Sequence, residues 1–343
     1  MMLLASMACV ATPLARPSVT PAPVSRERPE YPIPPGLINT ITPGPTPTIY
    51  PLGSSDNPIV LAFVTENPDD VSLAAIGEIA RFVTDSTGYY FEPAVFASYN
   101  DLLPELQAGL VHFAWLPPIT YLWAHQNNYA NATLLTNHFG ITKYGTQFLA
   151  NSDSGFTIYF DPENSTNSAD DATALAQFAG YRPCWVDPSS ISGYILPAGL
   201  LAENQVEVSS GVMAQDHTAV IRSLYVKGVC DFGVTYTYSG DPRTANSLTD
   251  LTDVSTQIPI IWRSDAVIPT LNLSSHPRVH PEIILALSST LTQLGSQPDG
   301  QALLSTANDY EIAGLDAAKD EMYDDLRLAV DALGLDIEPL IGY

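Results

Sequence analysis

A short polar segment, residues 187–194 (DPSSISGY), carries residue types well suited to holding a small anion. It lies between an expected strand and an expected helix, and it combines three serine hydroxyls with Gly193, which allows close approach to the backbone. Hydroxyls and free N–H groups at the start of a helix can hold an oxyanion without a cationic side chain. The same pattern also fits an ordinary N-cap, because serine is among the preferred residues there.

One histidine and three tyrosines are further candidates to contact such a ligand. His217 follows Asp216 at the start of a later expected helix, although a histidine in this position is usually a surface residue. Tyr99 begins the helix after the second expected strand, Tyr121 follows the third, and Tyr144 precedes an expected crossing between lobes. A tyrosine at a strand end offers a hydroxyl and an apolar wall, but most of the 17 tyrosines are expected simply to pack.

The charge balance restricts what this protein can bind. Thirteen Lys and Arg residues against 37 Asp and Glu residues give a net charge of −24, which excludes electrostatic binding to nucleic acid or to an anionic membrane. Lysine occurs only three times in the 343 residues. A small anionic ligand must therefore be held mainly by neutral donors.

From residue 58 onward the sequence alternates between apolar strands and amphipathic helices. The continuous apolar run 59–64 predicts a strand buried on both faces, and a helix starts near Asp70 and ends at Gly88. The other expected strands are 90–96, 111–116, 147–151, 182–186, 205–209 and 230–235. The other expected helices are 100–108, 170–178, one starting near 192, 217–227, 280–294, 300–305 and 313–333.

Short connections between these elements predict an α/β fold with two lobes, each a mostly parallel sheet flanked by helices. Lobe 1 is expected to hold residues 56–149 plus 263–343, because the last helices have no expected strands of their own, and lobe 2 residues 150–262. Two crossings, near Ala150 and Trp262, join the lobes. Ligands bind at the carboxyl ends of parallel strands, so we expect the cleft between the lobes to hold the ligand.

The sequence of residues 1–55 predicts a processing signal followed by a tether. Residues 1–10 form an apolar stretch shorter than the roughly 20 residues that span a bilayer. It ends in Ser6-Met7-Ala8-Cys9, which resembles a bacterial lipobox in its small residue at Ala8 and departs from it at Ser6. Residues 11–55 are rich in proline and are expected to form an extended spacer. The segment is either the tether of a protein lipidated at Cys9 or a disordered tail.

The two remaining cysteines, Cys184 and Cys230, lie in short apolar runs that read as buried strands. In an exported protein two cysteines on neighbouring strands can be bridged, and two unpaired thiols in the core fit the pattern equally. A metal site is not expected, because no CxxC motif or paired histidine accompanies either cysteine.

Three segments resemble the phosphate/phosphite/phosphonate-binding proteins of ABC importers: AWLPPITY (114–121), DPSSISGYILP (187–197), and His217 followed by KGVCD (227–231). The resemblance runs from about Pro58 to Leu315 and implies the fold of type II periplasmic binding proteins. It further implies that Ser190, Ser192 and His217 bind the ligand oxygens.

By the same resemblance, Ile191 and Gly193 belong to the binding turn, and aromatic residues of the first lobe, Tyr99 and Tyr144, close over the ligand. Tyr121, within the first matching segment, and Thr65, after the first strand, complete the candidate binding residues.

Two departures from the family pattern bear on the ligand. The family's turn typically reads Ser-Thr-Ser-Gly, whereas Ile191 replaces the middle hydroxyl here. Phosphonate-binding members carry a carboxylate near the position of Tyr238 for the ligand's amine, and often an acid shortly after the Ile-Pro of the last crossing, where this chain has Thr270, Leu271 and Asn272. We therefore expect phosphate, phosphite or a simple phosphonate, or else a different small polar ligand.

The expected function is that of an extracytoplasmic solute-binding protein, lipid-anchored or periplasmic, which needs no cofactor and delivers its ligand to an ABC permease in the membrane. A sensor or scavenger without an importer is the alternative among binding proteins, and an enzyme on the same fold is the alternative from another class. Ser190, His217 and Asp231 match a catalytic triad by residue type alone, but a triad is defined by geometry. No GxSxG, HExxH, P-loop or GxGxxG motif occurs in a suitable context, so catalysis is not expected.

Overall fold

The structure, a computed structural model, describes residues 50–237 and 240–341. The predictions for Cys9, for the lipobox-like residues 1–10 and for most of the proline-rich segment lie outside the described residues. Within the described part, none of the helices combines the length and the apolar character that crossing a bilayer requires.

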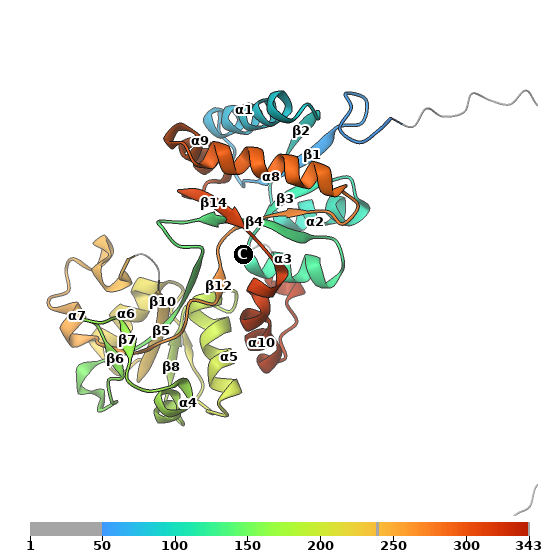
Figure 1. Cartoon of the computed structure of the whole chain (residues 1–343). Coiled ribbons are helices and arrows are strands. Elements are labelled where there is room, and N and C mark those ends of the chain that lie inside the picture. The colour runs from blue at the N-terminus through green and yellow to red at the C-terminus, as the bar shows by residue number, and fades with distance from the viewer. Residues whose placement is uncertain (1–49, 238–239, 342–343) are drawn as a thin grey trace, which may run out of the picture. The chain divides into compact units, whose positions relative to one another are not determined.

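The first sheet has six strands in the order β14-β4-β13-β3-β1-β2 (Figure 1). Its strands are β1 (Ile59–Val64), β2 (Phe91–Phe96), β3 (Phe113–Leu116), β4 (Asn131–Asn137), β13 (Asn272–Ser275) and β14 (Gly314–Ala317). β1 pairs in parallel with β2 and β3, whereas the pairings of β13 and β14 are antiparallel.

Helices cover both faces of this sheet (Figure 1). The core on one face includes residues of α1 (Asp70–Thr87), α8 (Pro281–Gly295) and α9 (Pro298–Asn308). The core on the other face includes residues of α2 (Tyr99–Ala108), α3 (Pro118–Gln126) and α10 (Asp324–Leu333). α1 shows why the sequence folds this way: Asp69 and Ser72 form a capping box at its start, and Ile76, Ile79 and Val83 share its buried face.

The second sheet has the order β11-β5-β10-β8-β9, with β12 also paired to β5. Its strands are β5 (Lys143–Ala150), β8 (Pro183–Trp185), β9 (Val212–Met213), β10 (Phe232–Thr237), β11 (Ile260–Arg263) and β12 (Ile268–Pro269). Its α-helices are α4 (Asp171–Leu175), α5 (Leu196–Glu203), α6 (His217–Val226) and α7 (Val254–Gln257), and a small separate ribbon pairs β6 (Phe160–Asp161) with β7 (Thr166–Asn167).

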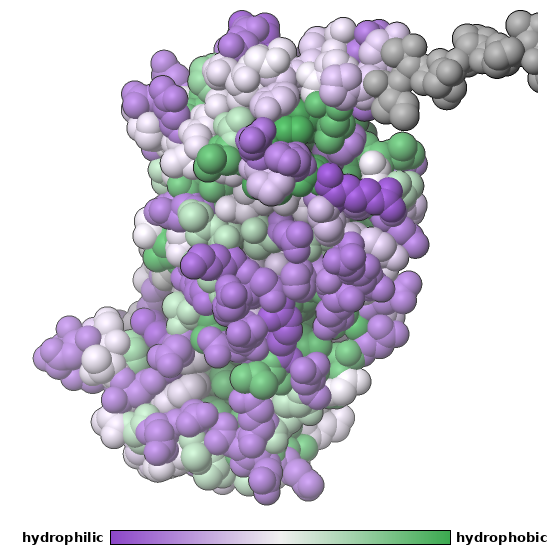
Figure 2. Space-filling model, turned by 45° about the vertical axis from the view of Figure 1, so that its right-hand side comes forward, coloured by the Kyte–Doolittle hydropathy of each residue, from purple (hydrophilic) through white to green (hydrophobic). Residues whose placement is uncertain are grey.

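Short helical turns complete the described chain. They are η1 (Ser152–Ser154), η2 (Ala176–Phe178), the π-helical η3 (Ile191–Ile195), η4 (Pro242–Thr244), η5 (Asn246–Leu248), η6 (Asp320–Tyr323) and η7 (Glu338–Leu340). Hydrophilic residues dominate the face seen in Figure 2, where hydrophobic residues appear in small separate groups. Such scattered apolar residues are normal for a solvated surface.

The α/β fold class with two sheets is confirmed, but both sheets are mixed rather than mostly parallel. β5 runs antiparallel to β10 and β11, and β13 runs antiparallel to β3 and β4. The chain leaves the first sheet after Asn137, enters the second at Lys143, and returns to the first at β13, after β12 has paired with β5. β5 and β13, the strands that follow the two crossings, therefore run antiparallel to their neighbours. Such antiparallel strands beside parallel pairs are common in large α/β sheets.

Two element predictions are wrong. Residues 205–209 do not form a strand. Gln205 adopts a positive φ of 58°, and the Val206 N–H donates back to the Leu201 carbonyl at the end of α5. The strand that pairs with β8 at this edge is β9. The predicted helix 313–333 begins only at Asp324. Near the start of the predicted range, residues 314–317 form β14 instead. Pairing with β4 satisfies the backbone groups of β14, and Leu315 packs in the core.

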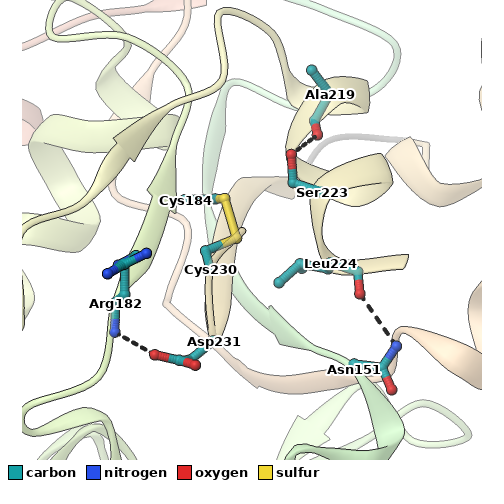
Figure 3. The surroundings of a disulfide bond; sticks show 8 residues. All are labelled: Asn151, Arg182, Cys184, Ala219, Ser223, Leu224, Cys230 and Asp231. Carbon is teal, nitrogen blue, oxygen red and sulfur yellow. Dashed lines mark hydrogen bonds between the residues drawn. A yellow bond between two sulfur atoms is a disulfide. The ribbon is translucent and has the colours of Figure 1, made fainter. Parts of the chain in front are cut away.

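A disulfide joins Cys184 of β8 to Cys230 just before β10, with the two Cα atoms 5.6 Å apart (Figure 3). The two strands are parallel neighbours, and Cys184 lies opposite Gly233. Beside the bridge the backbone N–H of Arg182 donates to the carboxylate of Asp231 at 2.8 Å. The sequence left open whether these cysteines are bridged or free; the structure has the bridge.

Candidate ligand-binding site

A cavity of about 570 Å³, hereafter the first cavity, lies where several loops and strand ends of both sheets converge. Its lining residues are His138, Phe139, Tyr144, Ser190, Ile191, Ser192, His217, Tyr236 and Gly240. This volume lies within the range of small-molecule sites. Among the described residues, the lining contains hydroxyls and imidazoles but no lysine, arginine or carboxylate.

Residues 187–194, hereafter the serine turn, connect β8 to α5 and form one wall of the first cavity. Ser190 caps η3, and its Oγ accepts a hydrogen bond from the Gly193 N–H at 3.1 Å. Accepting this bond leaves the hydroxyl hydrogen of Ser190 available to donate. The N–H of Ile195 reaches back to the Ser190 carbonyl at 3.0 Å, which gives the wide turn of a π-helix, a local form often found at functional sites.

Gly193 has a structural role in this turn. A Cβ atom at this position would lie 2.4 Å from a methyl carbon of Val186, so only glycine lets the turn pack against the end of β8. Ser192, by contrast, is almost fully buried and lines the first cavity. Its carbonyl accepts a hydrogen bond from the Thr146 hydroxyl at 2.7 Å, which ties the turn to β5. This backbone anchor fixes the turn without using the Ser192 hydroxyl.

His217 reaches the first cavity from the first residue of α6. Asp216 caps this helix by accepting from the Ala219 N–H at 2.8 Å, and the His217 ring packs edge-on against Tyr236, with the centroids 4.7 Å apart. The Nδ1 atom of His217 is buried and has no hydrogen-bond partner. Leaving a buried polar atom unpaired costs free energy, so a polar ligand in this cavity has a ready partner in the ring.

Burial lowers the pKa of His217 to about 4, although the nearby Asp216 and Asp187 carboxylates oppose the shift. The imidazole is therefore neutral near pH 7 and can donate from one ring nitrogen only. Burial, with a smaller contribution from Asp241, also raises the pKa of Tyr236, which keeps that phenol protonated. The first cavity thus presents neutral donors.

Comparison with known proteins now identifies the protein family. Residues 61–323 match the family model described as "ABC transporter, phosphonate, periplasmic substrate-binding protein". The chain belongs to this family. The family consists of substrate-binding proteins of ABC transporters rather than enzymes, and it acts outside the cytoplasm together with a membrane permease.

Individual relatives agree with this assignment. The phosphate-import protein PhnD of Mycolicibacterium smegmatis is 24% identical over 246 residues, which cover 68% of this chain and 70% of that protein. Two solved structures share the fold: XAC2383 from Xanthomonas citri bound to chloride ion, and PhnD1 from Prochlorococcus marinus in complex with methylphosphonate. Their TM-scores are 0.57 and 0.50 and their identities 16% and 11%; each alignment covers 80% of this chain, and 97% and 98% of the respective structure.

Five of the residues predicted from the sequence line the first cavity of this substrate-binding protein: Tyr144, Ser190, Ile191, Ser192 and His217. They come from β5, the serine turn and α6, and the first and last of them, Tyr144 and His217, are 73 positions apart in the sequence. Whether they bind ligand stays a prediction. Tyr99 lines a neighbouring cavity instead, and burial raises the pKa of its phenol.

Three other predicted residues do not line the first cavity. Tyr121 is fully buried in the core of the first sheet, and its hydroxyl donates to the Asp320 carboxylate at 2.8 Å. Thr65 lies after β1, where its N–H bonds to the Phe96 carbonyl. Gly193 packs behind the turn for the steric reason given above. In this structure the Tyr121 side chain therefore faces the core rather than the first cavity.

The residues that match a catalytic triad by type are not assembled as one. Asp231 lies beside the disulfide and lines a different cavity, together with Cys230 and Lys227. The carboxylates that influence the pKa of His217 are those of Asp216 and Asp187 instead. In addition, no cluster of three or more potential metal-ligating side chains occurs in the described ranges 50–237 and 240–341.

Sequence reasoning missed three side chains of the first cavity: His138, Phe139 and Tyr236. His138 stacks on Tyr310, with the centroids 4.3 Å apart, and Phe139 is 59% exposed in the loop after β4. A loop has no periodicity that would single out either residue. Tyr236 had a usable signal, because continuing the predicted strand 230–235 by one residue places it at the carboxyl end.

The neutral state of His217 predicts a measurable pH dependence. In the unfolded chain its pKa is about 6.5, so between about pH 6.5 and pH 4 the unfolded state binds more protons than the folded one. The contribution of His217 to stability is therefore complete above pH 6.5 and is lost as the pH falls towards 4. A proton NMR titration of the His217 ring should give a pKa well below 6.5, and His217→Gln should flatten the fall in the free energy of unfolding over this window. A ring that titrates at or above pH 6.5 would contradict a buried, neutral imidazole.

Proposed function

We propose that this protein captures a small phosphorus oxyanion, namely phosphate, phosphite or a simple phosphonate, in the first cavity and delivers it to its ABC permease. The observation that carries the proposal is the convergence of Ser190, Ser192 and the neutral His217 on one cavity. Preorganised hydroxyl and N–H donors can offset the lost hydration of an anion where cationic side chains are absent. A relative named as a phosphate importer and a similar fold holding methylphosphonate support the ligand class.

We further propose that the two sheets mark two lobes, near the predicted division into residues 56–149 plus 263–343 and residues 150–262. Sheet membership supports moving the first boundary to the loop 138–142, because β5 pairs with β10 and β11. Closure of two such lobes around a ligand is a common binding motion. Lipidation at Cys9, with residues 11–55 as the tether, is part of the same proposal, and membrane fractionation of the wild type and Cys9→Ala tests it.

Titration calorimetry with phosphate, phosphite and methylphosphonate tests the ligand class, with acetate as a carboxylate control. We expect saturable binding of at least one phosphorus oxyanion at one site per chain and no binding of acetate. If none of the three phosphorus compounds binds, the proposed ligand class is wrong, while the family assignment stands.

A further inference from the structure

A second cavity of about 330 Å³ adjoins the first one and shares two of its lining residues, Tyr144 and Ile191. Its remaining walls include Pro117, Pro118, Pro269 and Leu271. A tetrahedral oxyanion held by the serine turn needs no such apolar space. A ligand that extends past Ile191 would enter it.

Tyr99, Tyr144 and Tyr310 also line the second cavity, whereas its Thr270 and Asn308 side chains are engaged within the protein. The buried Thr270 hydroxyl donates to backbone carbonyls, those of Thr136 and, at 3.1 Å, Thr142. The side-chain amide of Asn308 donates to the Leu304 carbonyl at 2.9 Å. Asp309, the one charged residue that the described part of the chain contributes to this lining, is exposed at the end of α9. A solvated carboxylate at the rim, with apolar walls inside, favours an apolar occupant over a charged one.

We propose that the ligand is a phosphonate carrying an apolar alkyl or aryl substituent, and that the second cavity binds this substituent. The inference rests on the proposed function, because it assumes that the oxyanion lies in the first cavity. Ile191 is then the residue that determines specificity. It lies between Ser190 and Ser192, lines both cavities, and places an apolar side chain where the carbon substituent leaves the phosphorus group.

The ligand series that tests this proposal is methylphosphonate, propylphosphonate and 2-aminoethylphosphonate, measured by titration calorimetry on the wild-type protein. Each buried methylene should tighten binding about fourfold, so propylphosphonate should bind roughly tenfold or more tightly than methylphosphonate. The aminoethyl compound has nearly the shape of the propyl compound but ends in an ammonium group. It should bind more weakly than propylphosphonate, because the ammonium loses hydration against apolar walls.

Two variants of Ile191 sharpen the test. Ile191→Thr keeps the β-branched shape but introduces a hydroxyl between the two serines, and Ile191→Val is the matched apolar control. Ile191→Thr should reduce the preference for propylphosphonate over methylphosphonate severalfold, whereas Ile191→Val should largely retain it. Both variants remain informative if slightly destabilised, because the readout is a ratio of two affinities on the same protein.

The outcomes separate this inference from the proposed function. If methylphosphonate or phosphate binds but propylphosphonate binds no more tightly than methylphosphonate, the inference is overturned and the proposed function stands. Tighter binding of the aminoethyl compound than of the propyl compound also overturns it, in favour of an ammonium subsite at Asp309, Tyr99 and Tyr310. If no phosphorus oxyanion binds at all, both are wrong.

Discussion

Ser192→Ala is expected to weaken methylphosphonate binding roughly 10- to 100-fold, because a hydrogen bond to a charged group contributes about 1.5–3 kcal/mol. The Ser192 carbonyl, not its hydroxyl, anchors the turn to Thr146. Removing the hydroxyl should therefore leave the turn in place. Calorimetry measures the affinity, and a thermal melt without ligand checks that the fold is intact.

The same turn provides a matched control. The Ser189 hydroxyl donates to the Asp187 carboxylate, and Ser189 does not line the first cavity. Ser189→Ala should bind methylphosphonate nearly as well as the wild type. Ser190→Ala should lose affinity and also stability, because it removes the N-cap of η3 at a cost of about 0.5–2 kcal/mol. Wild-type affinity in Ser192→Ala would mean that this wall of the cavity does not hold the anion.

Loss of the disulfide should produce the largest change in stability. The bridge closes a loop with a sequence separation of 46, for which chain entropy predicts a contribution of about 4 kcal/mol to the free energy of unfolding. Both cysteines are buried, so the double substitution Cys184→Ala and Cys230→Ala leaves only small gaps in the core. Urea unfolding should show this loss in the double variant and in the reduced wild type.

Reductant supplies the control for this experiment. It should lower the stability of the wild type and leave that of the double variant unchanged, because the variant has no bridge to break. If the oxidised wild type and the double variant unfold at the same urea concentration, the bridge contributes no net stability. The methylphosphonate affinity should be similar in both proteins, since neither cysteine lines the first cavity.

Local signals in the sequence predicted those elements whose patterns were long or well capped. α1 is an example, because Asp69 and Asp70 mark its start, Gly88 its end, and its apolar residues recur at helical spacing. The serine turn and the start of α6 were predictable for the same reason. β14 was not, because four residues with one buried leucine carry no periodicity, and their pairing partner β4 lies far away in the sequence.

The errors at the candidate site have a similar origin. α3 begins with Pro118 at its first turn, a favourable helix start, and its buried face turns Tyr121 towards Tyr323 and Asp320 rather than into a cavity. Neither partner is near Tyr121 in the sequence. His138 and Phe139 reach the first cavity from a loop, where position is set by tertiary contacts such as the stacking of His138 on Tyr310.

The central claim is that neutral donors hold an anion within a protein of net charge −24. Methylphosphonate titrations at ionic strengths of about 0.01 M and 1 M test it most directly, since the screening length falls from roughly 30 Å to 3 Å between them. Potassium gluconate serves as the salt, so that chloride does not compete. We expect the affinity to stay constant or to rise with salt, because screening weakens the repulsion from the acidic surface. A severalfold loss of affinity at high salt would show that cationic side chains hold the ligand and would contradict this account.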